Sequence, residues 1–269
     1  MRRKAILVPL VLLAACRGGE EAPMPAPSGS EVADAAVAVS EAAPEARAFK
    51  QEISNDRYSF SYAYPAAAAA IPALKTQLDA EMDEARADIA DMGKAGLREA
   101  RADKREFNPY DRSISWTVVT ELPGWLSLLG DAYEFSGGAH GNTNTTPLLW
   151  DKAAGRRRDP LSLFVSKEAF DGALGQAYCA ALNKERAKRR ETPVDPGSGD
   201  EFDKCLAPSE VTVLLGSSDK RHFNRIGLIA DPYAAGPYVE GSYEVTLPVS
   251  DALLKAVKPE YRGAFTIGR

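Results

Sequence analysis

Histidine and cysteine are scarce in this chain, which limits the metal chemistry that it can support. Its 269 residues include two histidines, His140 and His222, and three cysteines, Cys16, Cys179 and Cys205. A zinc site needs three or four nitrogen, sulfur or oxygen ligands, and no HxH or HExxH spacing occurs. We therefore expect no bound metal ion and no cofactor.

The motifs of hydrolytic catalysis are also missing. No GxSxG nucleophile elbow is present, and no recognisable pair of carboxylates marks a glycoside hydrolase. Ser136 precedes His140 by a few residues, but nothing nearby in the sequence would orient the histidine as a base. We expect no catalytic residue, and an enzyme is the lesser of our hypotheses.

Long apolar runs and an excess of positive charge are absent as well. The apolar run at residues 5–13 is far shorter than the ~20 residues that a transmembrane helix needs. Acidic residues outnumber basic ones, 38 against 33, and the formal net charge is −5. An acidic protein is poorly suited to contact phosphates, so we expect no nucleic-acid partner.

What the chain does have, first, is a secretory signal at residues 1–15. A basic start at residues 2–4 precedes the apolar run, and small residues lead to Cys16. This pattern is typical of a signal peptide. The sequence LAAC, which ends at Cys16, resembles the lipobox of bacterial lipoproteins, and this implies that Cys16 carries lipid and anchors the protein to a membrane. Ordinary cleavage near Ala15 is the alternative.

Residues 16–48 are expected to form the lipidated cysteine and a tether. The segment is rich in Ala, Pro and Glu and has no aromatic residue. Such a composition buries too little apolar area to offset the entropy of ordering. Arg17 stands where an aspartate would mark retention in the inner membrane of Gram-negative bacteria. We therefore expect a cell-envelope lipoprotein of the outer membrane that faces the periplasm.

Cys179 and Cys205 remain as an even pair in an oxidising compartment, and we predict a disulfide between them. The segment that they enclose contains ETPVDPGSGDEF, residues 191–202, which is loop-like and weakly held without a covalent link. Two buried free thiols are the alternative.

Residues 49–269 are predicted to form one globular α+β domain. Amphipathic spacing predicts two main helices, at residues 71–92 and 167–190, and a short one at 251–257. Gly93 and Gly96 are expected to weaken the first helix at its end. Strand patterns occur at 53–64, 113–122, 125–135, 145–150, 211–215, 225–229 and 242–247. Short turns between strands favour an antiparallel sheet packed with the two main helices.

The stretch FSGGAHGNTNTT, residues 135–146, is the most unusual in the domain. Gly137, Gly138 and Gly141 permit positive φ and close backbone approach, as a tight turn requires. His140 then has two interpretations. Its ring nitrogens could bond loop carbonyls and hold the turn, or the loop could present it to a partner.

Four further residues are candidates for binding. Asn142 and Asn144 form the polar continuation of the glycine loop, and Tyr233 and Tyr238 flank a Gly-Pro step. The tyrosines either pack at a strand end or form an aromatic contact surface for protein or sugar.

Two basic clusters have a simpler interpretation. Residues 156–158 are three arginines after a turn, and residues 184–190 place five basic side chains at the end of the second main helix. Cations are favoured at a helix C-terminus, so a solvated helix end is preferred over a site for anionic lipid or polymer.

Three motifs in order resemble a known family. They are GGAHG (137–141), DPLSLF (159–164) and DPYAAGPYVEG (231–241). Together they are similar to the RsiV-type extracytoplasmic domain of bacterial envelope proteins, a domain of unknown function that also accompanies the peptidoglycan deacetylase PdaC. The paired cysteines are similar to those of Gram-negative members. In RsiV the domain binds lysozyme, which implies that this domain recognises a lysozyme-type muramidase or peptidoglycan.

We therefore expect a monomeric binding module. The alternatives are a cell-wall hydrolase or deacetylase that uses His140, and a structural envelope lipoprotein without a ligand.

Overall fold

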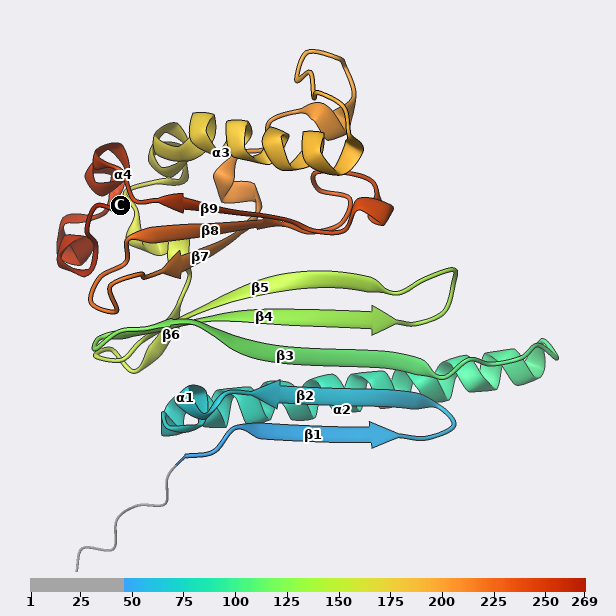
Figure 1. Cartoon of the computed structure of the whole chain (residues 1–269). Coiled ribbons are helices and arrows are strands. Elements are labelled where there is room, and N and C mark those ends of the chain that lie inside the picture. Colours follow the sequence, from blue (N-terminus) through green and yellow to red (C-terminus); the bar gives the residue numbers. More distant parts are fainter. Residues whose placement is uncertain (1–45) are drawn as a thin grey trace, which may run out of the picture. The chain divides into compact units, whose positions relative to one another are not determined.

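Six strands form the first sheet in chain order. The computed structural model describes residues 46–269, so the predicted signal, Cys16 and most of the tether lie outside the described residues. The strands, side by side in Figure 1, are β1 (Phe49–Ser54), β2 (Tyr58–Tyr64), β3 (Tyr110–Glu121), β4 (Trp125–Phe135), β5 (Asn142–Asp151) and β6 (Arg156–Arg158).

The first two strands form a hairpin where the sequence predicted a single strand. The side chain of Asn55 makes the turn, because its Oδ1 accepts hydrogen bonds from the backbone N–H groups of Arg57 and Tyr58 at 2.9 and 3.2 Å. Such local bonding by an asparagine side chain imitates a backbone turn. The turn lets β1 pair antiparallel with β2.

β2 and β3 are the one parallel pair in this sheet; its other neighbours are antiparallel, as predicted. They are joined through α1 (Ala66–Ala69) and α2 (Pro72–Ala102). A parallel pair needs such a long crossover. The predicted α+β class is confirmed, and the purely antiparallel sheet is corrected at this one pair.

α2 continues ten residues beyond the predicted end of its amphipathic stripe, at residue 92, and passes through Gly93 and Gly96, which were expected to weaken the helix there. Both glycines are buried where another chain segment comes close. A Cβ on Gly93 would lie 2.6 Å from the carbonyl oxygen of Arg57, and one on Gly96 would lie 2.6 Å from the hydroxyl of Tyr110. The glycines therefore permit close packing and do not break the helix.

Gly93→Ala is expected to lower the free energy of unfolding by about 1–3 kcal/mol, since overpacking against backbone outweighs the ~1 kcal/mol gain in helix propensity. Gly172 in the second main helix is the matched control, because a Cβ there would meet no atom within 4 Å. Urea unfolding should show Gly172→Ala unchanged or stabilised. Equal effects of the two substitutions would contradict the packing account.

A second, three-stranded sheet consists of β7 (Thr212–Gly216), β8 (Arg225–Ala230) and β9 (Tyr243–Pro248), all antiparallel. α3 (Lys167–Arg190) and α4 (Asp251–Ala256) pack with it. The two ends of α3 agree with the prediction, and Ser166 caps its start by accepting the N–H of Ala169 at 3.1 Å.

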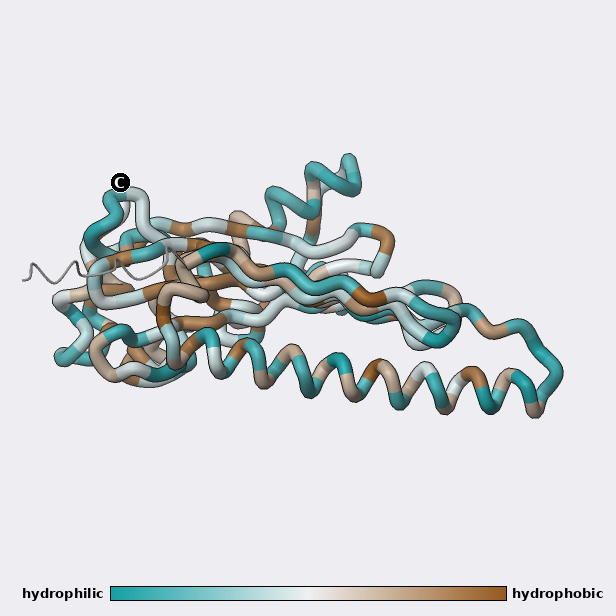
Figure 2. Tube along the Cα trace, turned by 90° about the horizontal axis from the view of Figure 1, so that it is seen from below, coloured by the Kyte–Doolittle hydropathy of each residue, from teal (hydrophilic) through white to brown (hydrophobic). Residues whose placement is uncertain are grey.

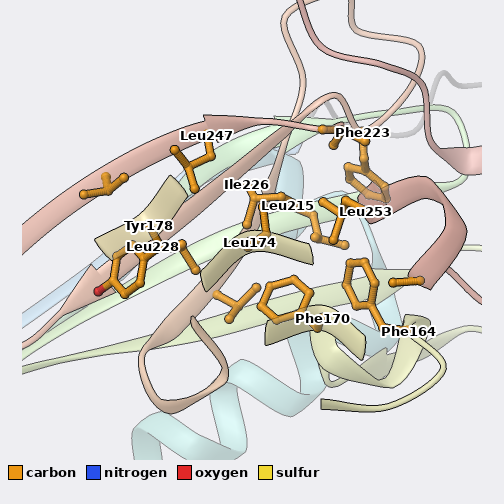
Figure 3. Packing of buried hydrophobic residues seen from close by; sticks show 14 of the residues in the cluster. Phe164, Phe170, Leu174, Tyr178, Leu215, Phe223, Ile226, Leu228, Leu247 and Leu253 are labelled. Carbon is orange, nitrogen blue, oxygen red and sulfur yellow. The ribbon is translucent and has the colours of Figure 1, made fainter. Parts of the chain in front are cut away.

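Two apolar cores result, one for each sheet. α3 contributes Phe170, Leu174, Tyr178 and Leu182, at most 2% exposed, to the core over the second sheet. Figure 3 labels the first three of them. The leucine and phenylalanine side chains each contribute roughly 1.5–3 kcal/mol when fully buried. Tyr178 contributes less than its area suggests, because its buried hydroxyl has no hydrogen-bond partner among residues 46–269. Figure 2 shows hydrophobic and hydrophilic positions alternating along α2, whose apolar stripe packs on the first sheet.

The two sheets meet where β7 contacts β3, β4 and β5. The hydroxyl of Thr212 donates to the carbonyl oxygen of Thr145 at 3.1 Å, which links β7 to β5. Within residues 46–269 no helix is long and apolar enough to cross a membrane.

Candidate binding surface

The loop between β4 and β5 is shaped by its glycines. Gly137 and Gly138 have φ values of +100° and +91°, a region that other residues rarely enter. Gly141 does not have positive φ, but a Cβ there would lie 2.4 Å from the ring of Tyr133. Two glycines thus make the turn, and the third lets the chain pass an aromatic ring.

His140 and Tyr238 meet at the carbonyl oxygen of Gly141. The His140 Nδ1–H donates to this oxygen at 2.9 Å, and the Tyr238 hydroxyl donates to it at 2.7 Å. The two rings stack with centroids 3.9 Å apart and an interplanar angle of 19°. The Tyr238 hydrogen bond and the ring stacking therefore tie the 231–241 loop to the glycine loop.

Tyr233 and Val239 extend this contact into an exposed surface. Tyr233 is 54% exposed, Val239 is 90% exposed, and the ring of Tyr233 lies 5.6 Å from that of Tyr238. The backbone of Tyr233 has φ of +71°, stabilised by its N–H bond to the oxygen of Gly236 at 3.1 Å. Non-glycine residues with positive φ cluster at functional sites. We call His140, Tyr233, Tyr238 and Val239 the aromatic tip.

The structure thus brings three of the predicted binding residues together and separates the other two. Asn142 and Asn144 belong to β5 and are exposed there, so they are not part of a loop tail. Val239 was not predicted. Its exposure depends on a short 3₁₀ turn at Tyr238–Glu240, which the sequence motif alone did not indicate.

Arginines near the C-terminus of α3 hold the 231–241 loop through hydrogen bonds and an ion pair. Arg186 donates through Nε to the carbonyl oxygen of Ala235 at 2.8 Å, and Arg190 pairs with Glu240 at 2.9 Å. Arg189 donates to the backbone oxygen of Glu240, and its guanidinium lies 4.0 Å from the centroid of the Tyr243 ring.

The interpretation of this helix end as solvated is therefore wrong for two of its five basic residues, Arg186 and Arg190, whereas Arg189 is exposed although it contacts Glu240. Arg186 is fully buried, and the Arg190 side chain is only 17% exposed. The Arg156–Arg158 cluster is also not simply solvated. It forms β6, and Arg157 and Arg158 pair with Glu81 and Asp151.

The charged groups in this network shift one another's protonation. Burial and the neighbouring charge of Arg190 lower the pKa of Arg186. Burial alone would raise the pKa of Glu240, but hydrogen bonds from Arg190 and Tyr243 lower it below its usual value. Glu240 is thereby kept ionised, so its attraction to Arg190 persists at neutral pH.

The predicted disulfide is present. Cys179 of α3 is bonded to Cys205, with the Cα atoms 5.1 Å apart. The same loop is also held just before Cys205, because Arg186 donates to the oxygen of Lys204 at 3.0 Å and Arg190 pairs with Asp203 at 2.6 Å. α3 therefore fixes both this loop and the loop that carries the aromatic tip.

The leading aspartates of two motifs line a hollow of about 330 Å³ beside β7. Asp159 accepts the N–H of Leu161 at 2.9 Å and so caps a 3₁₀ turn. Asp231 accepts the N–H and the hydroxyl of Thr145 at 3.0 and 2.9 Å. Both carboxylates accept hydrogen bonds that hold loops in place. This structural role accounts for the aspartates of the two motifs, and no acid–base pair is needed to explain them.

Catalytic geometry around His140 is missing from the described part of the chain. The Nδ1 atom of His140 bonds a backbone carbonyl, where a catalytic histidine would contact an orienting carboxylate. His222 lies on another loop, with Nδ1 3.4 Å from Asp219. Among residues 46–269, no group of three or more His, Cys, Asp or Glu side chains could hold a metal ion.

One family model and two solved structures match parts of this chain. Residues 51–143 match the family model described as "Deacetylase PdaC". A DUF3298 family member from Bacteroides fragilis has a similar structure, with a TM-score of 0.51 and 16% identity over 81% of this chain and 96% of that one. A DUF3298 protein from Pseudomonas aeruginosa is 18% identical over 82% and 95% of the chains, with a TM-score of 0.48. No curated protein matches significantly.

Proposed function

We propose that this protein is a lipid-anchored module of the cell envelope that binds a lysozyme-type muramidase through the aromatic tip. The observation that carries the proposal is that Tyr233 and Val239 are exposed beside Tyr238 on an ordered loop. Buried aromatic anchors supply most of the energy of protein interfaces, and a surface that is already ordered loses less entropy on binding. The clamp from α3 provides that order.

Charge supports a basic partner. The chain has a net charge of −5, and opposite charge on two proteins accelerates their encounter. The likeness to RsiV-type domains, the leader sequence before Cys16 and the match to the PdaC model all favour a role at the cell wall. Lipidation at Cys16 and location at the outer membrane are parts of this proposal.

The enzymatic alternative has weaker support. A hydrolase or deacetylase acting through His140 would need an orienting carboxylate or a metal ion, and neither lies beside His140 within residues 46–269. The description of the matching family as a deacetylase belongs to that family's model, which covers only residues 51–143.

Removal of the Tyr233 ring is expected to weaken muramidase binding at least about tenfold, as for an aromatic hot spot. Tyr233→Gly is the suitable change, because glycine adopts positive φ without strain. Binding of the full-length protein in detergent to immobilised lysozyme, measured by interferometry, gives the affinity.

Two valines provide a matched control for this test. Val239 in the tip and Val165 before α3 are 90% and 58% exposed. Val239→Asp should weaken binding and Val165→Asp should not. Equal effects would exclude the tip as the interface. Absence of lysozyme binding would refute the proposed partner, and turnover of purified sacculi that is lost in His140→Ala would establish the enzymatic alternative.

A further inference from the structure

A second cavity opens on the face of the first sheet that packs against α2, away from the 231–241 loop. It has a volume of about 270 Å³. We call it the Trp116 pocket. Its lining consists of Tyr62, Glu81, Ile114, Trp116, Gly130, Ala132, Asn144, Thr146 and Arg157.

Small residues on β4 create this cavity. Gly130 and Ala132 alternate on one face of the strand, beside Trp116 and Ile114 of β3. A Cβ on Gly130 would lie 2.8 Å from the ring of Trp116, so only glycine lets the indole lie across the sheet. The indole N–H donates to the Tyr62 hydroxyl at 2.9 Å, which fixes the ring in place. The floor is therefore apolar and preformed.

Free polar groups stand at the rim. Asn144 and Thr146 are two residues apart on β5 and so share one face of the sheet. Neither side chain forms a hydrogen bond to any other residue in the part of the chain from 46 to 269. An amide and a hydroxyl each offer both a donor and an acceptor to a ligand.

Arg157 and Glu81, which also line the pocket, carry opposite charges that balance each other. Arg157 Nη1 lies 3.5 Å from Glu81 Oε1, which also accepts from Gln77 at 2.8 Å. Arg157 Nη2 donates to the oxygen of Pro147 at 2.9 Å, and its guanidinium lies 5.7 Å from the centroid of the Trp116 ring. Because the ion pair is internally balanced, the pocket favours a neutral ligand over a cation or an anion.

We propose that the Trp116 pocket binds one neutral pyranose ring of a glycan. A pyranose has an apolar C–H face that suits an aromatic and aliphatic floor, and hydroxyl groups that suit an amide and a hydroxyl at the rim. The volume of about 270 Å³ is slightly below the ~300–1,000 Å³ of sites for drug-sized ligands, so the pocket accommodates no more than a single ring. Asn144 and Thr146 orient the sugar. Trp116 is only 7% exposed, so the apolar face of the sugar contacts Ile114, Ala132 and the accessible edge of the indole.

The pocket is independent of the muramidase site. The aromatic tip is built from the β4–β5 loop and the 231–241 loop, and none of its four residues lines the pocket. Failure of one proposal therefore leaves the other standing, and variants of each site serve as controls for the other.

Fluorine NMR of the full-length protein labelled with 5-fluorotryptophan tests the proposal directly. The chain has three tryptophans, and Trp116→Phe identifies the signal of Trp116. Titration with chitotriose and with cellotriose should shift this signal saturably for at least one sugar, with a dissociation constant on the order of 1 mM for a single-ring contact.

Asn144→Ala should weaken this binding at least fivefold, and Ala132→Leu should abolish it by filling the cavity. Asn142→Ala is the matched control, because Asn142 lies on the same strand face but outside the pocket. It should leave the affinity within twofold, as should Tyr238→Phe. No shift with either sugar, or binding that survives Ala132→Leu in a variant with unchanged melting temperature, would overturn the proposal.

Discussion

Replacement of Arg186 by methionine is expected to lower the free energy of unfolding by about 3–5 kcal/mol, since it leaves buried polar groups without partners. The side chain is fully buried and donates to the backbone oxygens of Ala235 and Lys204 at 2.8 and 3.0 Å, and to Asn183 at 2.9 Å. Methionine fills similar volume but donates no hydrogen bond, so the carbonyl of Lys204 loses this donor and that of Ala235 keeps only the longer bond from Arg190 Nη2, at 3.3 Å.

The opposite outcome is known for buried ion pairs, where apolar replacements can stabilise a protein. That case differs, because both charged partners are removed together. The direct partners of Arg186 are two carbonyls and an amide, which remain after the substitution. Its Nη2 has no hydrogen-bond partner within residues 46–269, which reduces what the arginine contributes but does not cancel three bonds from a charged donor.

Urea unfolding followed by circular dichroism measures this effect. Lys188→Met on the same helix is the control, because the Lys188 side chain is 78% exposed and its nearest carboxylate, in Glu185, is 4.0 Å away. We expect a change within about 0.5 kcal/mol for the control. A loss below 1 kcal/mol for Arg186→Met would show that the clamp on the 231–241 loop is not a major support of the fold.

The regular elements were largely predictable from the sequence because local rules determine them. The bounds and buried stripe of α3 follow from the spacing of Phe170, Leu174 and Leu182, and the structure adds Ser166 as the cap at its start. β4 follows from its apolar pattern and the Pro-Gly turn before it. In these segments, propensity, capping and periodicity all favour the same structure.

The arginine clamp could not be predicted from local patterns. A cation near a helix C-terminus is usually solvated, and only the folded chain shows that Arg186 meets carbonyls of two distant loops. Gly93 is a similar case, because the backbone that it contacts belongs to Arg57, which lies in the turn between β1 and β2 and is distant in the sequence. Both residues gain their roles from tertiary contacts, which a helical pattern does not contain.

The same distinction between local patterns and tertiary contacts applies to the candidate sites. The sequence indicated His140, Tyr233 and Tyr238 because glycine-rich and Gly-Pro segments form exposed turns. It did not indicate that His140 and Tyr238 share the carbonyl oxygen of Gly141. The Trp116 pocket was missed because β3 and β4 residues line it only after the strands pair, and no single segment carries its chemistry.

Loss of the disulfide is expected to have the second large effect on stability. Cys179→Ser with Cys205→Ser should lower the free energy of unfolding by about 3.5 kcal/mol from the entropy of the open loop alone. The bond closes a sequence separation of 26 residues around a loop that has two prolines and few buried side chains. Dithiothreitol should produce a similar loss in the unmodified protein and no further change in the double-serine variant.

A double-mutant cycle separates this loop entropy from the contacts that the loop makes. Lys204 and Asp203 beside the bond are held by Arg186 and Arg190, so the loop and the clamp share partners. Residues that share partners usually couple by more than about 0.5 kcal/mol. Arg186→Met should therefore destabilise the double-serine variant less than it destabilises the disulfide-bonded protein. Strict additivity would mean that the disulfide acts only on the unfolded chain, and that the clamp holds the 203–205 segment equally well without it.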